Sequence, residues 1–273
     1  MENIHGTSLS SQINNWTGIQ ESLRRRLVLE DDFKWRVPTH EDGSEENSIA
    51  ETLKYVGGVD LSFLKDDPSI ACAGLVVVDL DNFNVVYDDF SVVQLQIPYI
   101  PGFLAFREAP ILLELLEKVK HDAPLFYPQL LMVDGNGLLH PQGKGSVGFG
   151  LACHLGVIAN LPTIGIGKNL HHVDGLVQSE VRILLEAKEN CSKDLVTLTG
   201  YSGSTWGAAM RSTESSLKPI FVSIGHRISL DTALKAVKMT CKYRVPEPIR
   251  QADIRSRDYL QKHPWVAKIV QMQ

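Results

Sequence analysis

The pattern of apolar and polar residues predicts a run of buried strands that begins near residue 55. Tyr55–Phe63 and Ile70–Asp79 are apolar runs of the length expected for buried strands, and Asn84–Gln94 follows as a third. Asp81 and Asn82 supply turn-forming side chains between the second and third runs. Because the segments between the runs are short and polar, we predict an antiparallel meander.

The rest of the chain alternates between helical and strand patterns. A helix is predicted over about residues 106–120, where leucines recur at helical spacing on one face. The elements expected after it are a strand at Leu130–Asp134, a helix at Phe149–Ile158, a strand at Thr163–Ile166, a helix near 180–190, a strand at Pro219–Ile224, a helix at 230–240 and a last helix from about Ile249.

This order of elements predicts how the strands lie in space. A right-handed crossover through the 106–120 helix places the fourth strand parallel to the first and beside it. The fifth strand then lies outside the fourth. We therefore predict an α/β fold with a mixed sheet, in which three antiparallel strands are followed by parallel strands in the order 3-2-1-4-5, with helices on its faces.

The chain before residue 50 follows a different pattern. A possible helix over about residues 11–30 carries Arg24, Arg25 and Arg26, and a stretch rich in Glu, Asp, Ser and Gly follows at about 41–48. We interpret this stretch as a linker. A chain of 273 residues suits one large domain with appendages.

Composition excludes some classes of protein. No run of about 18 apolar residues occurs, so we expect no membrane span, and the N-terminus has no secretory pattern. The cysteines are widely spaced in apolar surroundings and are expected to be reduced thiols of an intracellular protein: Cys72, Cys153, Cys191 and Cys241. The net charge of −5 argues mildly against a nucleic-acid partner, unless bound metal neutralises several carboxylates.

Carboxylates interrupt or end two of the predicted strands. Asp60 follows an apolar segment, and Asp134 ends the strand at Leu130–Asp134. A single such aspartate is usually a turn residue, but the predicted topology brings Asp60, Asp134 and Lys168 to one carboxyl edge, where α/β sheets bind ligands. Glu108, at the start of the crossover helix, can point to the same edge. Clustered carboxylates repel one another unless a cation intervenes, and their oxygens suit Mg²⁺ or Mn²⁺.

Three other motifs are expected to have no catalytic or cofactor-binding role. Gly143–Gly148 matches a dinucleotide-binding pattern, but it begins nine residues past a strand end and indicates a loop insertion. Gly200–Gly203 lacks the spacing of a nucleophile elbow. His171 and His172 are expected in an exposed loop.

Three further features leave two interpretations open. His226 leaves a strand just before a helix and is either structural or functional. Asp253 lies on an apolar helix stripe and either forms an ion pair, with Arg250 or Arg257, or belongs to the acidic site. Pro98–Gly102 is a stiff segment with one aromatic residue between prolines, typical of a packed loop or of a stacking wedge.

These segments together resemble the endonuclease V family over roughly residues 55–258. The blocks that carry the resemblance are VGGVD ending at Asp60, PYIPGFLAFRE at Pro98–Glu108, VDGNG at Val133–Gly137, ACHLGV at Ala152–Val157, Lys168 after GIG, GHR at Gly225–Arg227 and PEPIRQAD ending at Asp253. The resemblance implies a ribonuclease-H-like fold. It also implies hydrolysis of the second phosphodiester bond 3′ to inosine or deoxyinosine, leaving 3′-hydroxyl and 5′-phosphate ends.

The resemblance also implies roles for single residues. Asp60 and Asp134 resemble direct metal ligands, and Glu108 resembles a third acid that acts partly through metal-bound water. His226 is similar to the family's catalytic-site histidine, and Asp253 to a further acidic residue near the site. The implied cofactor is Mg²⁺, with Mn²⁺ as a substitute.

The substrate-contacting residues follow in the same way. Tyr99, flanked by Pro98 and Ile100, resembles the wedge that stacks beside a displaced base. The resemblance places Gly102 and Leu104 near the hypoxanthine pocket. It gives two residues a place on the phosphate side of the site: His140 and Lys168.

Two departures from the family pattern affect the expected substrate. Residues 141–148 form a longer loop than usual, and Asn136 is typical of eukaryotic members whereas PYIPG is closer to bacterial ones. We expect inosine-containing single-stranded RNA first, then deoxyinosine-containing DNA. The alternatives are a non-catalytic inosine-binding protein and another ribonuclease-H-like nuclease, such as a junction resolvase.

The expected organisation is an N-terminal helix and linker (1–50), a catalytic domain (51–262) and a C-terminal tail (263–273). We expect a monomer in the cytoplasm, the nucleus or both, with no membrane partner.

Overall fold

An eight-stranded mixed sheet forms the centre of the molecule, with the strand order β5-β4-β3-β6-β7-β10-β9-β8. The computed structural model describes residues 3–38, 51–141, 148–187, 195–214, 216 and 218–265. The strands are β3 (Tyr55–Phe63), β4 (Ile70–Asp79), β5 (Asn84–Gln94), β6 (Leu130–Asp134), β7 (Thr163–Gly167), β8 (Leu195–Thr199), β9 (Thr205–Met210) and β10 (Ile220–His226).

The predicted order of the first five strands is confirmed. β3, β4 and β5 are antiparallel neighbours, and β3 pairs in parallel with β6, which pairs in parallel with β7. β10 adds antiparallel to β7 and extends to His226, past a bulge that follows Ile224. The β8–β9 hairpin was not predicted, because β8 is short and only alternate residues of it are buried.

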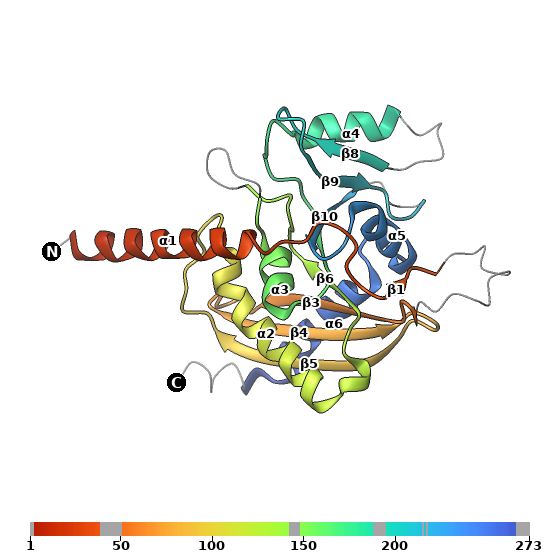
Figure 1. The fold of residues 1–273 in the computed structure, drawn as a ribbon. Helices are drawn as coiled ribbons and strands as arrows, with labels where there is room; N and C mark the ends of the chain where they lie inside the picture. Colours follow the sequence, from red (N-terminus) through yellow and green to blue (C-terminus); the bar gives the residue numbers. More distant parts are fainter. Residues whose placement is uncertain are drawn as a thin grey trace.

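Successive residues of the central strands serve two cores. Leu131 and Val133 of β6 pack in one cluster with residues of α2 (Leu104–Asp122) and α3 (Leu151–Ala159). Leu130 and Met132 face the other way, toward α5 (Leu230–Thr240) and the start of α6 (Glu247–Lys262). Figure 1 shows α2 and α3 in front of the sheet and α6 behind it. This alternation is what one strand between two layers of helices requires.

Several helix boundaries differ from the prediction. α1 spans Asn3–Arg24, so its predicted end near residue 30 is wrong. α2 begins at Leu104, which leaves Pro110 inside the helix. α6 begins at Glu247, because Pro248 fits the first turn of a helix. α4 covers Gln178–Ala187.

The chain after α1 packs against the domain. Trp35, in the short strand β1 (Trp35–Arg36), is buried in the same core as Leu130, and its ring stacks on Phe33 at 3.7 Å between centroids. β1 pairs in parallel with β2 (Glu51–Thr52). The expected linker at 41–48, most of the 141–148 loop, Cys191 and most of the 263–273 tail lie outside the described residues.

The described part of the chain bears on two expectations, the state of the cysteines and the lack of a membrane span. Cys72, Cys153 and Cys241 carry free thiols. No helix among the described residues is long and apolar enough to cross a membrane.

Candidate active site

Two aspartates lie side by side where parallel strands end. Val59 of β3 pairs with Val133 of β6, so Asp60 and Asp134 come next on adjacent strands. Their carboxyl groups are hydrogen-bonded to each other, which requires a proton between them. The predicted juxtaposition at the carboxyl edge of the sheet is therefore present.

Lys168 joins this pair from the neighbouring strand. Its Nζ donates to Asp134 Oδ2 at 2.5 Å, and its backbone follows directly after β7. Burial alone would lower the pKa of Lys168, but the nearby carboxylates, first Asp134 and then Asp60, outweigh burial and raise that pKa. The lysine therefore stays charged beside the two acids.

The site holds more negative charge than this lysine balances. Asp60 is 8% exposed, and burial raises its pKa to about 9, with further contributions from Asp134 and Asp253 against the opposing charge of Lys168. Burial also raises the pKa of Glu108 to about 7, with Arg107 opposing and Asp134 adding to the shift. Both carboxyl groups therefore take up protons in the absence of a cation.

Helices on opposite faces of the sheet supply the outer acids. Glu108 is buried on α2, and Asp253 lies on α6. α6 contacts β3 so closely that a Cβ at Gly58 would lie 2.1 Å from the Pro248 carbonyl carbon. This approach brings Asp253 near enough to contribute to the raised pKa of Asp60.

Asp253 combines the two interpretations that its sequence left open. Its carboxylate is paired with Arg257, four residues on in α6, and it also acts on Asp60. Arg250 pairs instead with Glu247, at 2.7 Å. Asp253 is thus both an ion-pair partner and a member of the acidic cluster.

The donor set suits a divalent cation, although it is not closed around one. Carboxylate oxygens are the ligands that Mg²⁺ and Mn²⁺ prefer, and the proton shared by Asp60 and Asp134 marks a place for positive charge. Among the described residues, no three His, Cys, Asp or Glu side chains converge closely enough to hold an ion as they stand. Asp60 and Asp134 are the adjacent carboxylates that could hold such an ion, and Glu108 lies near enough for Asp134 to raise its pKa.

Arg244 fixes the backbone of the lysine and had no signal in the sequence analysis. Its Nη2 donates to the carbonyls of Lys168 and Pro219, each at 2.9 Å, and its Nε donates to that of Lys218 at 3.2 Å. One guanidinium therefore joins the end of β7 to the start of β10.

The side chain of Asn136, in the VDGNG motif, is buried. It is 7% exposed, and its Oδ1 has no hydrogen-bond partner among the described residues. A Cβ at Gly167 would lie 2.7 Å from that oxygen, so the amide lies against the end of β7. An open buried acceptor thus lies next to the strand that carries Lys168.

The Pro98–Gly102 loop leads into α2 and presents an aromatic side chain to solvent. Tyr99 is 62% exposed, Pro98 is exposed and Ile100 is half-buried, so a fully packed loop is excluded for Tyr99. Gly102 has a φ of +90°, which glycine adopts without strain. Leu104, the first residue of α2, lies between this loop and Glu108.

His226 lies away from the acidic cluster, so the structure does not bring it together with the other residues expected in the site. It pairs with Thr163 at the start of β7, whereas Asp134 pairs with Ile166. Three extended residues separate the two levels by about 10 Å, at the opposite end of the parallel strands. The His226 Nδ1 accepts a hydrogen bond from the Val28 N–H at 3.2 Å, and burial, with nearby arginines, lowers its pKa to about 4.

His140 lies close to the loop that follows Lys168. Its ring centroid is 6.3 Å from that of His171, three residues after Lys168. Burial, then the neighbouring His171, lowers the pKa of His140 to about 4, so its imidazole is neutral at pH 7. His171 and His172 are exposed, as expected of a loop pair.

Comparison with known sequences connects this arrangement to one family. The profile of the family described as Endonuclease V matches residues 35–254. Endonuclease V of Mus musculus is 45% identical over 90% of this chain and 69% of its own length. The Homo sapiens protein is 42% identical over 90% of this chain and 83% of its own length.

Solved structures extend the similarity to the fold. The catalytic domain of human endonuclease V superposes with a TM-score of 0.80 at 40% identity, covering 92% of this chain and 97% of that one. Endonuclease V of Ciona intestinalis, in complex with a 23mer DNA containing an inosine followed by a ribo-adenosine, superposes with a TM-score of 0.79 at 33% identity. That comparison covers 92% of this chain and 98% of the Ciona chain.

Proposed function

The chain belongs to the endonuclease V family and is a hydrolytic nuclease that cleaves phosphodiester bonds, and we propose that it is directed to inosine. The proposed reaction is hydrolysis of the second phosphodiester bond 3′ to inosine in RNA, and to deoxyinosine in DNA. The observation that carries the proposal is the adjacent pair of Asp60 and Asp134 with Lys168 on the edge of a ribonuclease-H-like sheet. The products would carry 3′-hydroxyl and 5′-phosphate ends.

The proposed mechanism assigns the cluster to charge control at the scissile phosphate. Asp60 and Asp134 would hold Mg²⁺, or Mn²⁺ in its place, with Glu108 binding through water. A bound divalent cation supplies the positive charge that lowers the pKa of a water nucleophile and stabilises the leaving oxygen. Lys168, held beside Asp134, would offset the negative charge that builds on the phosphate in the transition state.

The outer groups have proposed roles in the same reaction. Asp253 adds to the negative charge around Asp60 and so strengthens the preference for a cation. His140 is neutral at pH 7 and would donate a hydrogen bond to a phosphate oxygen. A neutral donor adds no charge to compete with the cation.

RNA is the proposed first substrate. The VDGNG motif supports this choice, as does the Ciona relative, whose bound DNA places a ribo-adenosine after the inosine. A family member thus accepts a 2′-hydroxyl directly after the inosine. The base would be displaced into a pocket near Gly102 and Leu104, where lack of space for a 2-amino group would exclude guanosine.

Tyr99 is the proposed wedge beside the displaced base. Its exposed ring sits on a loop restrained by Pro98 and Pro101. Stacking on a base is worth about 1–3 kcal/mol. Tyr99→Ala should therefore slow cleavage of inosine in a duplex more than in a single strand, because a paired base must first be extracted. Tyr99→Phe should be mild, since the ring carries the effect.

One experiment tests the proposed function directly. Matched oligonucleotides with inosine in RNA, deoxyinosine in DNA, or guanosine at the same position are incubated with Mg²⁺ or with chelator. We expect Mg²⁺-dependent cleavage of the second phosphodiester bond 3′ to the inosine, fastest for single-stranded RNA. Retained binding without cleavage under every condition would favour the inosine-binding alternative, and cleavage independent of inosine would favour a different nuclease.

A further inference from the structure

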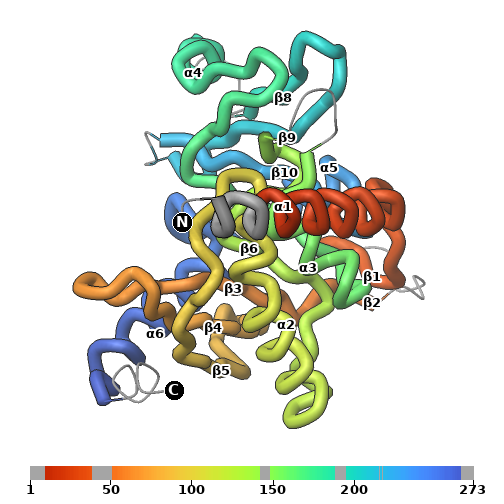
Figure 2. Tube along the Cα trace, turned by 90° about the vertical axis from the view of Figure 1, so that its left-hand side faces the viewer, coloured from red at the N-terminus to blue at the C-terminus, as the bar shows by residue number. Residues whose placement is uncertain are grey.

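The buried face of α1 lies against the loop that carries Tyr99. Trp16, Gln20 and Leu23 are 6%, 4% and 7% exposed and recur at helical spacing, so they form one stripe along the helix. α1 ends at Arg24 and precedes the segment that matches the family profile, which begins at residue 35. Figures 1 and 2 both show the chain between β5 and α2 next to this helix.

Two contacts join α1 to the end of the Pro98–Gly102 loop. Gln20 Nε2 donates to the Gly102 carbonyl at 2.9 Å, across 82 positions of sequence. The Trp16 ring stacks on Phe106 with 5.1 Å between centroids and 14° between planes, and lies 5.7 Å from Phe103. A polar contact and an aromatic contact thus hold the same junction between loop and helix.

This junction determines where the loop points. Gly102 has a φ of +90° and lies within the turn that a bond from the Phe103 N–H to the Ile100 carbonyl closes at 3.0 Å. The peptide that follows Gly102 is oriented by Gln20. Tyr99 is exposed, so its direction depends on the backbone of the loop more than on contacts of its own ring.

We propose that α1 positions the Pro98–Gly102 loop for substrate, with Gln20 and Trp16 as positioning residues for the Tyr99 wedge. The proposal rests on the proposed function, since it assigns α1 a part in extraction of the inosine base. Gln20 and Trp16 touch the loop rather than the substrate. Their effect is to keep the loop in the conformation that binds, which lowers the cost of ordering it during the reaction.

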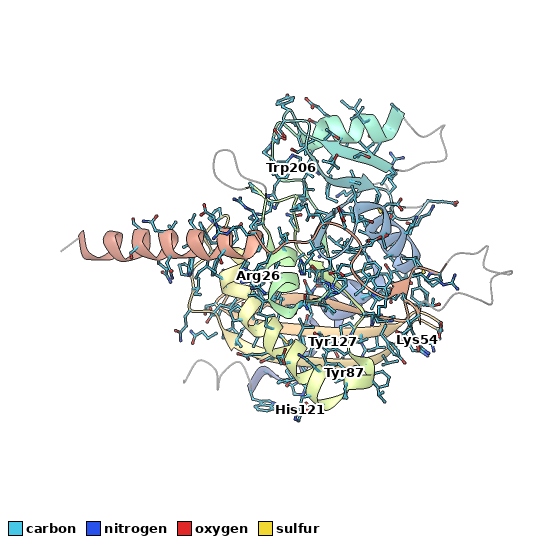
Figure 3. All side chains as sticks on the ribbon, viewed as in Figure 1. Arg26, Lys54, Tyr87, His121, Tyr127 and Trp206 are labelled. Atoms are coloured by element: carbon cyan, nitrogen blue, oxygen red, sulfur yellow. The ribbon has the colours of Figure 1, made fainter. Side chains whose placement is uncertain are left out.

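α1 can act in this way because the chain just after Gln20, at the C-terminal end of the helix, is fixed to the domain. Leu23 packs with Phe149 and Cys153 beside α3, and Arg26 Nη2 donates to the Val157 carbonyl at 3.3 Å. Figure 3 shows Arg26 at this junction of α1 with α3. Two residues on, the Val28 N–H donates to His226 Nδ1 at the end of β10, and the Val28 carbonyl accepts from the Arg227 N–H. The helix is therefore held at Gly102 and again at its C-terminal end.

The test compares single-turnover cleavage by Gln20→Ala, Trp16→Ala and the matched control Gln12→Ala, which alters an exposed glutamine of the same helix. Each is measured with inosine in a duplex and in a single strand. We expect Gln20→Ala and Trp16→Ala to slow duplex cleavage roughly tenfold and single-strand cleavage much less, since misplacement of a contact group costs up to about a hundredfold. Gln12→Ala should match the wild type on both substrates.

A double variant with Tyr99→Ala distinguishes a positioning role of Gln20 from a general loss of structure. In the Gln20→Ala, Tyr99→Ala double variant, the loss on duplex should be close to that of Tyr99→Ala alone, because both changes remove the same wedge. Trp16→Phe, which keeps an aromatic ring, should restore most of the Trp16→Ala loss. Equal losses on both substrates, or losses that multiply with Tyr99→Ala, would overturn the proposal.

The outcomes also separate this inference from the proposed function. If Tyr99→Ala is impaired on duplex while Gln20→Ala and Trp16→Ala match the wild type, the role of α1 fails and the nuclease assignment stands. If the wild type does not cleave inosine substrates at all, the proposed function fails, and the inference fails with it.

Discussion

The two ends of the parallel strands differ in how their polar groups are satisfied. At the carboxyl end, Asp60 and Asp134 share a proton beside Lys168, and further acids add to the negative charge. At the other end, His226 is neutral and accepts a bond from the Val28 N–H, while Arg227 donates to the carbonyls of Asp32 and Asn160. Burial is the first cause of the raised pKa of Asp60 and of the lowered pKa of His226, but only the first end needs protons or a cation to balance its carboxylates.

This difference distinguishes a ligand-binding site, at the carboxyl end, from a structural contact at the other end. An excess of buried negative charge costs free energy unless a ligand compensates it, so such an excess indicates binding or catalysis. A buried group with its partners in place indicates structure. The GHR segment at Gly225–Arg227 bonds to the N-terminal segment, through His226 to Val28 and through Arg227 to Asp32.

The largest expected effect comes from removing one acid of the pair. Asp134→Asn should lower single-turnover cleavage of inosine RNA at least about a thousandfold, or about 4 kcal/mol of activation free energy, because a direct cation ligand is lost. Substrate binding should persist, since a negative charge has been removed. Asp66→Asn, at an exposed aspartate between β3 and β4, is the matched control. Near wild-type turnover by Asp134→Asn would show that the reaction does not take place at the carboxyl edge of the sheet.

The second effect concerns pH and metal together. In chelator, Asp60 and Glu108 have folded pKa values of about 9 and about 7, above their ordinary values of 3.8 and 4.5. The unfolded chain therefore binds fewer protons between these values, and stability falls as pH rises, by at most about 1.4 kcal/mol per pH unit for each proton. The Tm in chelator should be lower at pH 8 than at pH 6. A Tm that rises over this interval would contradict the assigned shifts.

Added Mg²⁺ and the variant Asp60→Asn should each change this dependence of the Tm on pH. Saturating Mg²⁺ should raise the Tm more at pH 8 than at pH 6, because the cation competes with the protons. Asp60→Asn should flatten the pH dependence in chelator, since it removes the group with the largest shift.

The third effect tests the opposite end of the strands. His226→Ala leaves the Val28 N–H without its acceptor and should lower the free energy of unfolding by about 1–3 kcal/mol. Cleavage below the Tm should stay within about threefold of the wild type. A general acid or base raises the rate by about 10²- to 10⁴-fold. A loss of cleavage rate of that size with an intact fold would show that His226 takes part in the reaction.

The smallest effect concerns the support of Lys168. Arg244→Ala removes the donor to three backbone carbonyls and should lower kcat roughly tenfold, with little change in KM, because the lysine shifts relative to Asp134. Arg244→Lys should recover little, since an ammonium lacks the fork of a guanidinium. Arg182→Ala, at an exposed arginine of α4, serves as the control. An unchanged kcat would show that the strand end holds Lys168 without Arg244.

Periodicity and topology were sufficient to predict the carboxyl edge. The apolar strands and the right-handed crossover place Asp60, Asp134 and Lys168 together, because strand pairing is a regular geometry. The misplacement of His226 has a physical reason. β10 runs antiparallel to β7, so its last residue lies at the other end of the strands, and strand direction at this position is not encoded in the local pattern.

The supporting contacts could not be predicted in the same way. Arg244 to Lys168 and Gln20 to Gly102 join side chains to backbone carbonyls across 76 and 82 positions. No periodicity in the sequence reports such contacts, since any exposed arginine or glutamine has the same local pattern. The β8–β9 hairpin was missed because its strands are short.

The contact of α6 with β3 has a consequence for when activity can first arise. Ser62 and Ser256, on these two elements, share a buried hydrogen bond of 2.7 Å across 194 positions. Contacts between such distant segments form slowly, and domains of this size acquire their last elements late in folding. During synthesis the ribosome makes α6 after every strand of the eight-stranded sheet, so Asp253 joins the acidic cluster only once those strands exist. A nascent chain that still lacks α6 therefore carries the Asp60–Asp134 pair without the nearby charge of Asp253.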